Sequence, residues 1–284
     1  MKQTSPGGSS PAAAADASPT PTTEPSSAPP LPFACANLTC TTFPTASDAL
    51  AAALSEPVGI VGFGEAHAPS DFTARTTVRR FQEELLPALA PRAGRLLVEL
   101  LVPPKGCEEQ RQQVQTESDA ITSGQSKDNQ NEYVELGRAA RELGVVPDIL
   151  RPSCRDMQAI ADAEVGVLVM METIATLSVE ATREWLAVTN PERRLVILYG
   201  GALHNDLSPR DNLETWSYGP RLSELSAGHY VEVDLVVPEL VQDTDSWRKF
   251  VWYDAVRALA KGHGPTLVQA SERSFALVFE ATPE

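Results

Sequence analysis

Two of the four histidines in this sequence occupy the same local pattern, in which an apolar run leads to a glycine three residues before the imidazole. The first pattern ends in Gly64-Glu-Ala-His67 and the second ends in Gly201-Ala-Leu-His204. Because 17 of the 284 residues are glycine, composition alone would give two of four histidines this spacing in roughly 2% of chains. The repeated pattern predicts that two imidazoles are delivered to one place.

Two glutamates are candidates to work with these histidines. Glu65 lies in the same predicted turn as His67, and Glu99 lies near the end of the next apolar run. A neutral imidazole can take a proton from water near physiological pH, and a carboxylate on its other nitrogen would select the tautomer. The candidate catalytic residues of a hydrolase acting on an ester, a lactone or an amide are therefore His67, Glu65, His204 and Glu99.

The same four side chains also suit a divalent metal ion. Two imidazoles with one or two carboxylates can bind zinc, manganese or iron and leave one position open for water. A third interpretation is structural, with both histidines hydrogen-bonded inside tight turns. The sequence contains no Gly-x-Ser-x-Gly elbow, Walker loop or dinucleotide fingerprint, which argues against a serine hydrolase or a nucleotide enzyme.

Other side chains near the two motifs carry weaker signals. Tyr199, just before the second motif, is interpreted as an aromatic residue at a strand end that packs on the core. Arg79, on the helix predicted after the first motif, could hold a substrate carboxylate or lie on a solvated face. Asn205 and Asp206 could orient His204 or cap the next helix. The other two histidines are interpreted as structural.

Strand and helix patterns alternate from residue 46 onward and must position these side chains. Strands separated by helices of this length pair in parallel through crossovers, and near-continuous apolar runs are typical of strands buried on both faces. We expect an α/β fold, with a mostly parallel central sheet, crossover helices on both faces and antiparallel strands near the C-terminus. The predicted strands are 58–63, 95–102, 145–150, 194–199, 230–237, 266–269 and 275–279, and the predicted helices are 47–55, 70–90, a polar stretch after Cys107, 132–143 and two within 154–189.

The topology places the motifs at one edge of this sheet. Ligands of open parallel sheets bind beyond the carboxyl ends of the strands, and His67 and His204 both lie just past such ends. Glycine suits these turns because it allows positive φ and a close backbone approach. The sequence therefore predicts a site at the carboxyl rim of the sheet.

Composition limits the partners of the chain. The net charge of −15 and the pI near 4.7 argue against nucleic acid, whose phosphates require clustered lysine and arginine. No apolar run approaches the roughly 18 residues of a membrane-spanning helix, so a small-molecule ligand or substrate is expected. The Ser/Pro/Ala/Thr-rich residues 1–32 are predicted to form a disordered tether, and residues 33–284 a single domain. No signal peptide precedes the tether, yet tethers of this composition commonly follow the cleavage site of exported lipoproteins.

The four cysteines favour export to an oxidising compartment. An even number permits two disulfides, although the sequence does not determine their pairing. Cys35 and Cys40 are close enough to close a small loop, while Cys107 and Cys154 each follow a predicted strand. Buried thiols are the alternative, and zinc binding is disfavoured because no Cys-x-x-Cys or Cys-x-x-His is present.

The paired motifs resemble those of the Tiki/TraB, erythromycin esterase and ChaN-like superfamily. The resemblance spans roughly residues 45–240, and Leu-Leu-Val-Glu99 looks like the acidic strand that follows the first motif in the ChaN and esterase branches. Ala68-Pro69 departs from these branches, which tend to carry a further His or Gly there. The resemblance implies an α/β domain that is exported, periplasmic or lipid-anchored.

The activities of that superfamily diverge, so the resemblance indicates the site better than the reaction. It implies either hydrolysis, with or without a divalent metal bound by the four candidate residues, or binding of haem or iron by an uptake lipoprotein without catalysis. Gly64, Gly201 and Tyr199 are the cofactor-binding candidates that it suggests. Any contact with a membrane would then be made only through an N-terminal lipid anchor.

Overall fold

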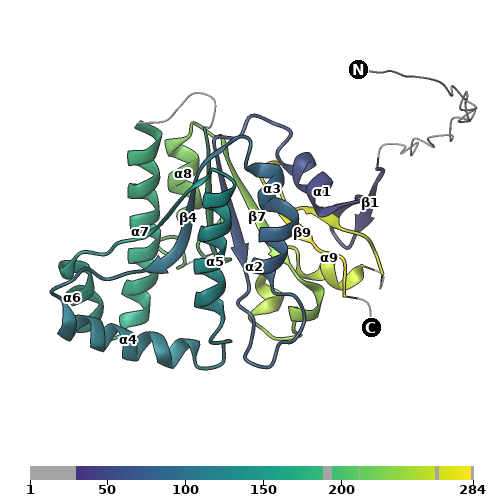
Figure 1. Ribbon diagram of the computed structural model, residues 1–284. Coiled ribbons are helices and arrows are strands. Elements are labelled where there is room, and N and C mark those ends of the chain that lie inside the picture. The colour runs from purple at the N-terminus through teal and green to yellow at the C-terminus, as the bar shows by residue number, and fades with distance from the viewer. Residues whose placement is uncertain (1–29, 188–193, 211, 260–261, 283–284) are drawn as a thin grey trace, which may run out of the picture. The chain divides into compact units, whose positions relative to one another are not determined.

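Nine strands form one mixed sheet in the computed structural model, which describes residues 30–187, 194–210, 212–259 and 262–282 (Figure 1). They are β1 (Pro32–Cys35), β2 (Leu38–Thr42), β3 (Ile60–Glu65), β4 (Ala93–Leu101), β5 (Val146–Leu150), β6 (Leu195–Gly201), β7 (Tyr230–Val236), β8 (Thr266–Gln269) and β9 (Ser274–Val278). Their order is β1-β2-β8-β9-β7-β3-β6-β4-β5. The pairs from β9 across to β5 are parallel, and the other three are antiparallel. The predicted mixed α/β fold with a mostly parallel sheet is confirmed.

The two motif strands are direct neighbours in this sheet. β3 pairs in parallel with β6, in a register that sets Gly64 opposite Gly200 and Glu65 opposite Gly201. β4 pairs with the other edge of β6. Both Gly-x-x-His turns and the end of the Glu99 strand therefore emerge side by side at the carboxyl rim.

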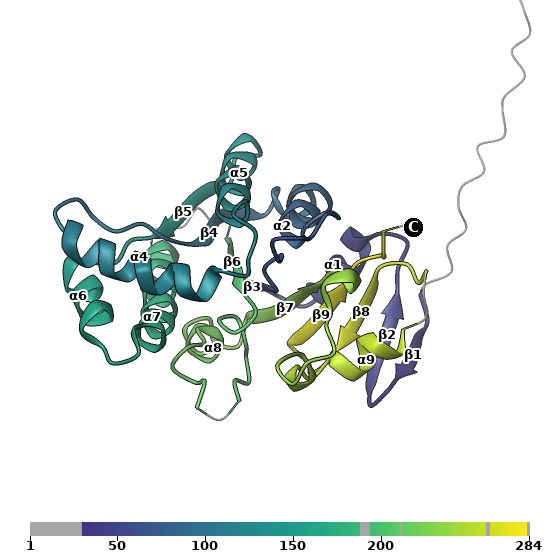
Figure 2. The same cartoon turned by 90° about the horizontal axis from the view of Figure 1, so that it is seen from below.

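The helices connect these strands and pack beside them (Figure 2). α5 (Asn129–Glu142) and α7 (Gly166–Ala187) both contact β4 and β5, and α8 (Gly219–Leu225) contacts β7. Short π-helical and 3₁₀-helical turns occur alongside the α-helices. The helical segments are α1 (Ala46–Ala53), α2 (Thr77–Arg80), the π-helical turn η1 (Phe81–Leu85), α3 (Leu86–Leu89), α4 (Glu108–Thr122), α5 (Asn129–Glu142), α6 (Cys154–Asp162), α7 (Gly166–Ala187), α8 (Gly219–Leu225), the 3₁₀ turns η2 (Pro238–Leu240) and η3 (Trp247–Lys249), and α9 (Tyr253–Ala258).

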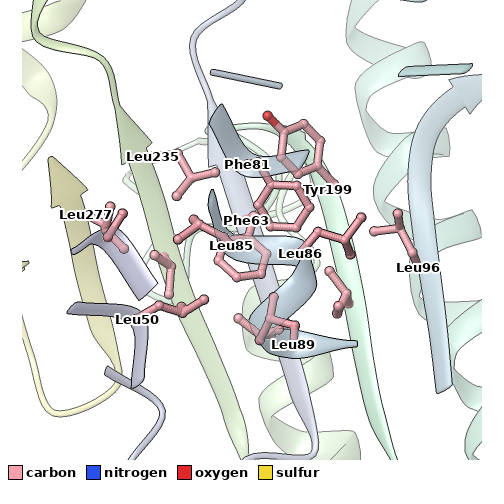
Figure 3. Close-up of a cluster of buried hydrophobic side chains, with 14 of the residues drawn as sticks. Leu50, Phe63, Phe81, Leu85, Leu86, Leu89, Leu96, Tyr199, Leu235 and Leu277 are labelled. Carbon is pink, nitrogen blue, oxygen red and sulfur yellow. The ribbon is translucent and has the colours of Figure 1, made fainter. Parts of the chain in front are cut away.

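Alternate residues of the central strands enter different hydrophobic clusters, as the period of two along a strand requires. Val61 and Phe63 of β3 belong to a large cluster that includes the π-helical turn, and Ile60 belongs to a second cluster with residues of α7. Figure 3 shows Phe63, Phe81 and Tyr199 together in the large cluster. The centroid of the Phe81 ring lies 4.8 Å from that of Phe63 and 4.7 Å from that of Tyr199. Aromatic packing therefore holds β3 and β6 in place beneath the site.

The helix predicted over 70–90 is wrong at its start. It begins only at Thr77, and the Thr76 hydroxyl accepts a hydrogen bond from the Arg79 amide as the N-cap. The residues before it form a loop instead, because the Ser70 amide donates to the carbonyl of Gly124, 3.2 Å away. A backbone group that is paired with a distant loop is not available for a helical hydrogen bond.

The N-terminal part of the domain also differs from the expectation. β1 and β2 form a hairpin that the sequence reasoning missed, and Pro32, assigned to the tether, already pairs with Thr41. Residues 1–29 of the predicted tether lie outside the described residues, whereas Leu31–Glu284 form one compact unit. The predicted antiparallel hairpin near the C-terminus is present as β8 and β9.

Two disulfides are present, as predicted. Cys35–Cys40 joins β1 to β2, and Cys107–Cys154 joins the residue before α4 to the first residue of α6. The second bridge spans 47 residues of chain and ties the two helices beyond the end of β4 together. Within the described residues, no helix combines the length and apolarity that crossing a membrane requires.

Candidate functional site

The structure brings His67, His204 and Glu99 together at the carboxyl rim of the sheet. The three side chains approach one point, which is where a Cβ atom on Gly201 would lie. Nε2 of His67 is 3.7 Å from that point, Oε2 of Glu99 is 3.8 Å from it, and Cδ2 of His204 is 3.9 Å from it. The juxtaposition follows from three adjacent parallel strands, β3, β6 and β4, that end at the same edge.

His67 is held by Glu65, the last residue of β3. Its Nδ1 lies 3.2 Å from Oε1 of Glu65, so Nδ1 donates to the carboxylate and Nε2 is the nitrogen that gains or loses a proton. Burial opposes a charge on His67, but the hydrogen bond and the negative charge of Glu65 outweigh it and raise the pKa of the imidazole. The His67 side chain is 27% exposed, whereas that of Glu65 is 2% exposed. A buried carboxylate thus directs a partly accessible base.

Two tyrosines complete the environment of Glu65. The Tyr133 hydroxyl donates to Oε1 over 2.8 Å, and the Tyr199 hydroxyl donates to Oε2 over 2.6 Å. Burial raises the pKa of both phenols well above the ordinary value, and the nearby carboxylate raises it further. Both hydroxyls therefore remain neutral donors, and they satisfy a charge that would be costly to bury without partners.

His204 is held in the opposite way. Its Nδ1 lies 2.7 Å from the carbonyl oxygen of Trp216, which can only accept, so Nδ1 carries a proton. Its Nε2 lies 3.4 Å from Oε1 of Glu99, and this contact is attractive only if one of the two atoms also carries a proton. Burial disfavours the charged form of both groups, but their mutual attraction raises the pKa of His204 and lowers that of Glu99. The contact therefore favours an imidazolium on His204 and a carboxylate on Glu99.

Glycines make room for this pair. The second oxygen of Glu99 accepts a hydrogen bond from the Gly201 amide over 2.7 Å, and a Cβ atom at Gly200 would overlap the same carboxylate. Gly64 is also required for a close approach, since a Cβ atom there would overlap Asn205. These glycines allow close packing and carboxylate binding, and their role in cofactor binding stays a prediction.

A cavity of about 280 Å³ opens beside His67. Its walls come from the turn after β3, from the loop after α4 and from the segment that follows β7. The lining residues are Ala66, His67, Pro69, Gly124, Gln125, Leu240, Gln242, Ser246, Trp247 and Phe250.

The loop after α4 is attached to the His67 turn at the point where the sequence departs from the resembling family. The carbonyl of Ala68 accepts hydrogen bonds from the Ser126 amide, over 2.9 Å, and from the Asn129 side chain, over 3.1 Å. Pro69 forms an isolated antiparallel bridge with Gln125. Ala68-Pro69 therefore fixes one wall of the cavity.

Two of the candidate residues have other partners. Arg79 pairs with Glu132 of α5, its Nε lying 2.7 Å from Oε1, and it does not line the cavity beside His67. The hydroxyl of Tyr199, only 1% exposed, lies on Glu65, so the residue supports the site from below. The described residues contain no group of three or more His, Cys, Asp or Glu side chains arranged to hold a metal ion.

Asn205 occupies a buried acidic network that sequence reasoning missed. Its amide nitrogen donates to Asp234 over 2.9 Å, and the Trp252 indole donates to the other oxygen of Asp234 over 2.7 Å. Burial raises the pKa of Asp234 to about 7 and that of Glu232, two residues earlier on β7, well above its usual range. Asn205 thus orients neither imidazole directly, and Asp206 accepts from the Ser208 amide within a local turn.

Other residues of the site were also missed. Tyr133 reaches Glu65 from a helix that begins 64 positions later in the chain at Asn129, and Trp247 and Phe250 reach the cavity after β7. No local motif marks any of them. The carbonyl of Trp216 could not have been found from side-chain types at all, because its contribution is a backbone atom.

Comparisons with known proteins add little. No family model matches the chain, and no curated protein matches it. The structure of the type III effector HopBA1 is similar over 87% of this chain and 98% of that chain, with 15% sequence identity and a TM-score of 0.44. A likeness at this level carries no argument about activity, so the function has to be argued from the site.

Proposed function

We propose that this protein is a hydrolase that attacks an ester, lactone or amide carbonyl with His67 as the general base. The observation that carries the proposal is the contrast between the two imidazoles. Nδ1 of His67 is bound by Glu65, which leaves Nε2 without a hydrogen-bond partner among the described residues, and His67 lines a cavity, while both ring nitrogens of His204 are engaged by a carbonyl and a carboxylate. A base next to a fixed positive charge is what addition of water to a carbonyl requires.

In the proposed reaction, Nε2 of His67 takes a proton from water, and the resulting hydroxide adds to the carbonyl carbon. The imidazolium formed in this step is stabilised by Glu65, whose own charge is held by two tyrosine hydroxyls. The positive charge of His204 stabilises the tetrahedral oxyanion, and Glu99 positions that imidazolium. His67 then returns its proton to the leaving alkoxide or amine as the carbon–oxygen or carbon–nitrogen bond breaks.

The setting of the enzyme is part of the proposal. Two disulfides suit an oxidising compartment, which supports an exported, periplasmic or cell-surface protein, tethered or lipid-anchored through its N-terminal segment. We also propose the finer architecture expected from the sequence, with crossover helices on both faces of the sheet, and a relationship to the Tiki/TraB, erythromycin esterase and ChaN-like superfamily.

The test is hydrolysis of a panel of 4-nitrophenyl esters, lactones and anilides by the wild type and by His67→Ala. We expect the variant to lose a factor of about 100 or more in kcat, the usual contribution of a general base. His229→Ala is the matched control, since His229 is exposed and its imidazole is hydrogen-bonded to the carbonyl of Pro57 instead of to a residue of the site. Equal rates for the wild type and His67→Ala would overturn the assignment.

Metal analysis and haem titration separate the remaining candidates. A stoichiometric metal in the purified wild type, lost from the His67→Ala/His204→Ala double variant, would replace the metal-free reaction with a metal-assisted one. A Soret band on addition of haem, lost from the same double variant and accompanied by no hydrolysis, would replace the hydrolase with a haem-binding protein.

A further inference from the structure

The walls of the cavity beside His67 are uncharged. Among the ten residues that line it, His67 alone is ionisable, and the other polar side chains are the amides Gln125 and Gln242 and the hydroxyl of Ser246. A charged substrate would lose water on entering, and among the residues that line the cavity only His67 could offset a negative charge. A neutral substrate avoids this desolvation cost, so the lining favours neutral substrates over charged ones.

The opposite wall is aromatic and rigid. Trp247 and Phe250 line the cavity, and Trp252 lies behind them, stacked on Phe250 with centroids 4.9 Å apart and in a T-shaped contact with Trp247 at 6.1 Å. Trp252 is 3% exposed and its indole nitrogen donates to Asp234. Because the supporting ring is fixed by packing and by a hydrogen bond, the two half-buried rings in front of it form a preorganised surface.

The arginine of this segment is bound by neighbouring carboxylates. Arg248 pairs with Asp243 at 2.8 Å and with Asp245 at 3.3 Å. Arg210 lies over the ring of Phe250, 5.1 Å from its centroid, but does not line the cavity. The guanidinium groups that could attract an anion therefore already have partners.

We propose that the cavity binds an uncharged ester or amide with a single planar ring, which packs against Trp247 while the scissile carbonyl lies at His67. This inference rests on the proposed hydrolase function and adds the substrate class. Gln125, Gln242 and Ser246 supply hydrogen bonds to neutral oxygen or nitrogen atoms of the substrate. The volume of about 280 Å³ lies at the lower end of the range of small-molecule sites, about 300 to 1,000 Å³, and suits one ring rather than several.

The experiment compares three methyl esters of similar size that differ in one property each. Methyl benzoate is neutral and planar, monomethyl terephthalate adds a carboxylate to the same ring, and methyl hexanoate is neutral without a ring. We expect kcat/KM for methyl benzoate to exceed that for the other two by about tenfold or more. A preference for the anion or for the acyclic ester would overturn the inference and leave the hydrolase assignment intact.

Variants of the aromatic wall locate the preference. Trp247→Ala should raise KM for methyl benzoate about tenfold with little change in kcat, and should leave methyl hexanoate unaffected, while Trp247→Phe should restore most of the affinity. Val251→Ala, at an exposed position of the same segment, is the matched control. An equal rise in KM for both esters would show that Trp247 supports only the fold. That result would reject its role as the ring-binding surface.

Binding without turnover distinguishes the two proposals. Benzamide and terephthalamate are titrated against the wild type, with tryptophan fluorescence and ligand saturation-transfer NMR as readouts. Binding of benzamide that Trp247→Ala abolishes, with no hydrolysis of any ester, would reject the hydrolase and retain the ring-binding cavity. Failure of benzamide to bind, or tighter binding of terephthalamate, would reject the cavity assignment whatever the enzymatic result.

Discussion

The hydroxyl of Tyr199 donates to Oε2 of Glu65 over 2.6 Å, although the two residues stand 134 positions apart in the chain. They meet because β3 and β6 are adjacent parallel strands, and Tyr199 faces the same cluster as Phe63. Together with Tyr133, this contact surrounds a buried carboxylate with donors. The orientation of His67 therefore depends on residues that belong to another strand and to α5.

Removing either hydroxyl should weaken the support of Glu65. We expect Tyr133→Phe and Tyr199→Phe each to lower kcat about tenfold and to reduce the free energy of unfolding by about 1 to 3 kcal/mol, the cost of leaving a buried hydrogen-bonding group without a partner. Steady-state kinetics and urea unfolding measure the two effects. Tyr253→Phe is the control, since its hydroxyl contacts Asp243 instead; a comparable loss of kcat in that variant would count against this role.

The rate of hydrolysis should depend on pH as a bell. Activity requires unprotonated His67, so it rises as pH increases through a pKa that is raised above the ordinary value. Activity also requires protonated His204, so it falls as pH increases through the raised pKa of that imidazole. Profiles of kcat/KM report both limbs for the free enzyme.

Two carboxylate variants assign the limbs of this profile. Glu65→Gln removes the charge that raises the pKa of His67, so the rising limb should move to lower pH. Glu99→Gln removes a charge that raises the pKa of both imidazoles, so it should move the falling limb, and the rising limb with it, to lower pH. A profile in which either variant leaves both limbs in place would contradict the assignment of the two imidazoles.

Stability should also depend on pH through Asp234. Its folded pKa is about 7 because of burial, above the roughly 3.9 of an exposed aspartate, so the folded state binds the proton more tightly than the unfolded state. The stabilising contribution is full below about pH 4 and is lost as pH rises through about 7. Asp234→Asn should therefore show a smaller fall in unfolding free energy between pH 5 and pH 8 than the wild type, measured by urea unfolding at each pH. Asp245→Asn, at an exposed ion pair, should keep the wild-type dependence.

Gly200 should tolerate no side chain. Its missing Cβ atom leaves the space that the Glu99 carboxylate occupies, so Gly200→Ala must displace Glu99 and with it His204. We expect a loss of about 1 to 3 kcal/mol of stability, typical of overpacking, and a loss of most activity. Gly59→Ala is the control, because the nearest atoms to a Cβ there lie 3.9 Å away. Circular dichroism, urea unfolding and kinetics distinguish the outcomes, and normal activity in Gly200→Ala would contradict the proposed positioning by Glu99.

The strands of the parallel part of the sheet, and the places of the two motifs on them, could be predicted from the sequence. Apolar runs such as 194–199 are long and regular enough to mark buried strands, and helical crossovers between them require parallel pairing. The carboxyl ends of parallel neighbours meet at one rim, so the proximity of His67, His204 and Glu99 was accessible from the pattern. Short or locally ambiguous elements could not be predicted from the sequence. β1 begins with a proline, and the start of the helix at Thr77 depends on a distant loop.

Only the tertiary structure decided what each imidazole can do. The protonation of His204 depends on a backbone carbonyl twelve residues away, and the orientation of His67 on Glu65, whose tyrosine partners come from another strand and from α5. The walls of the cavity come from segments after α4 and after β7 that share no motif with the histidine turns. Chemistry at this site arises from contacts between residues far apart in the chain, and no local spacing encodes those contacts.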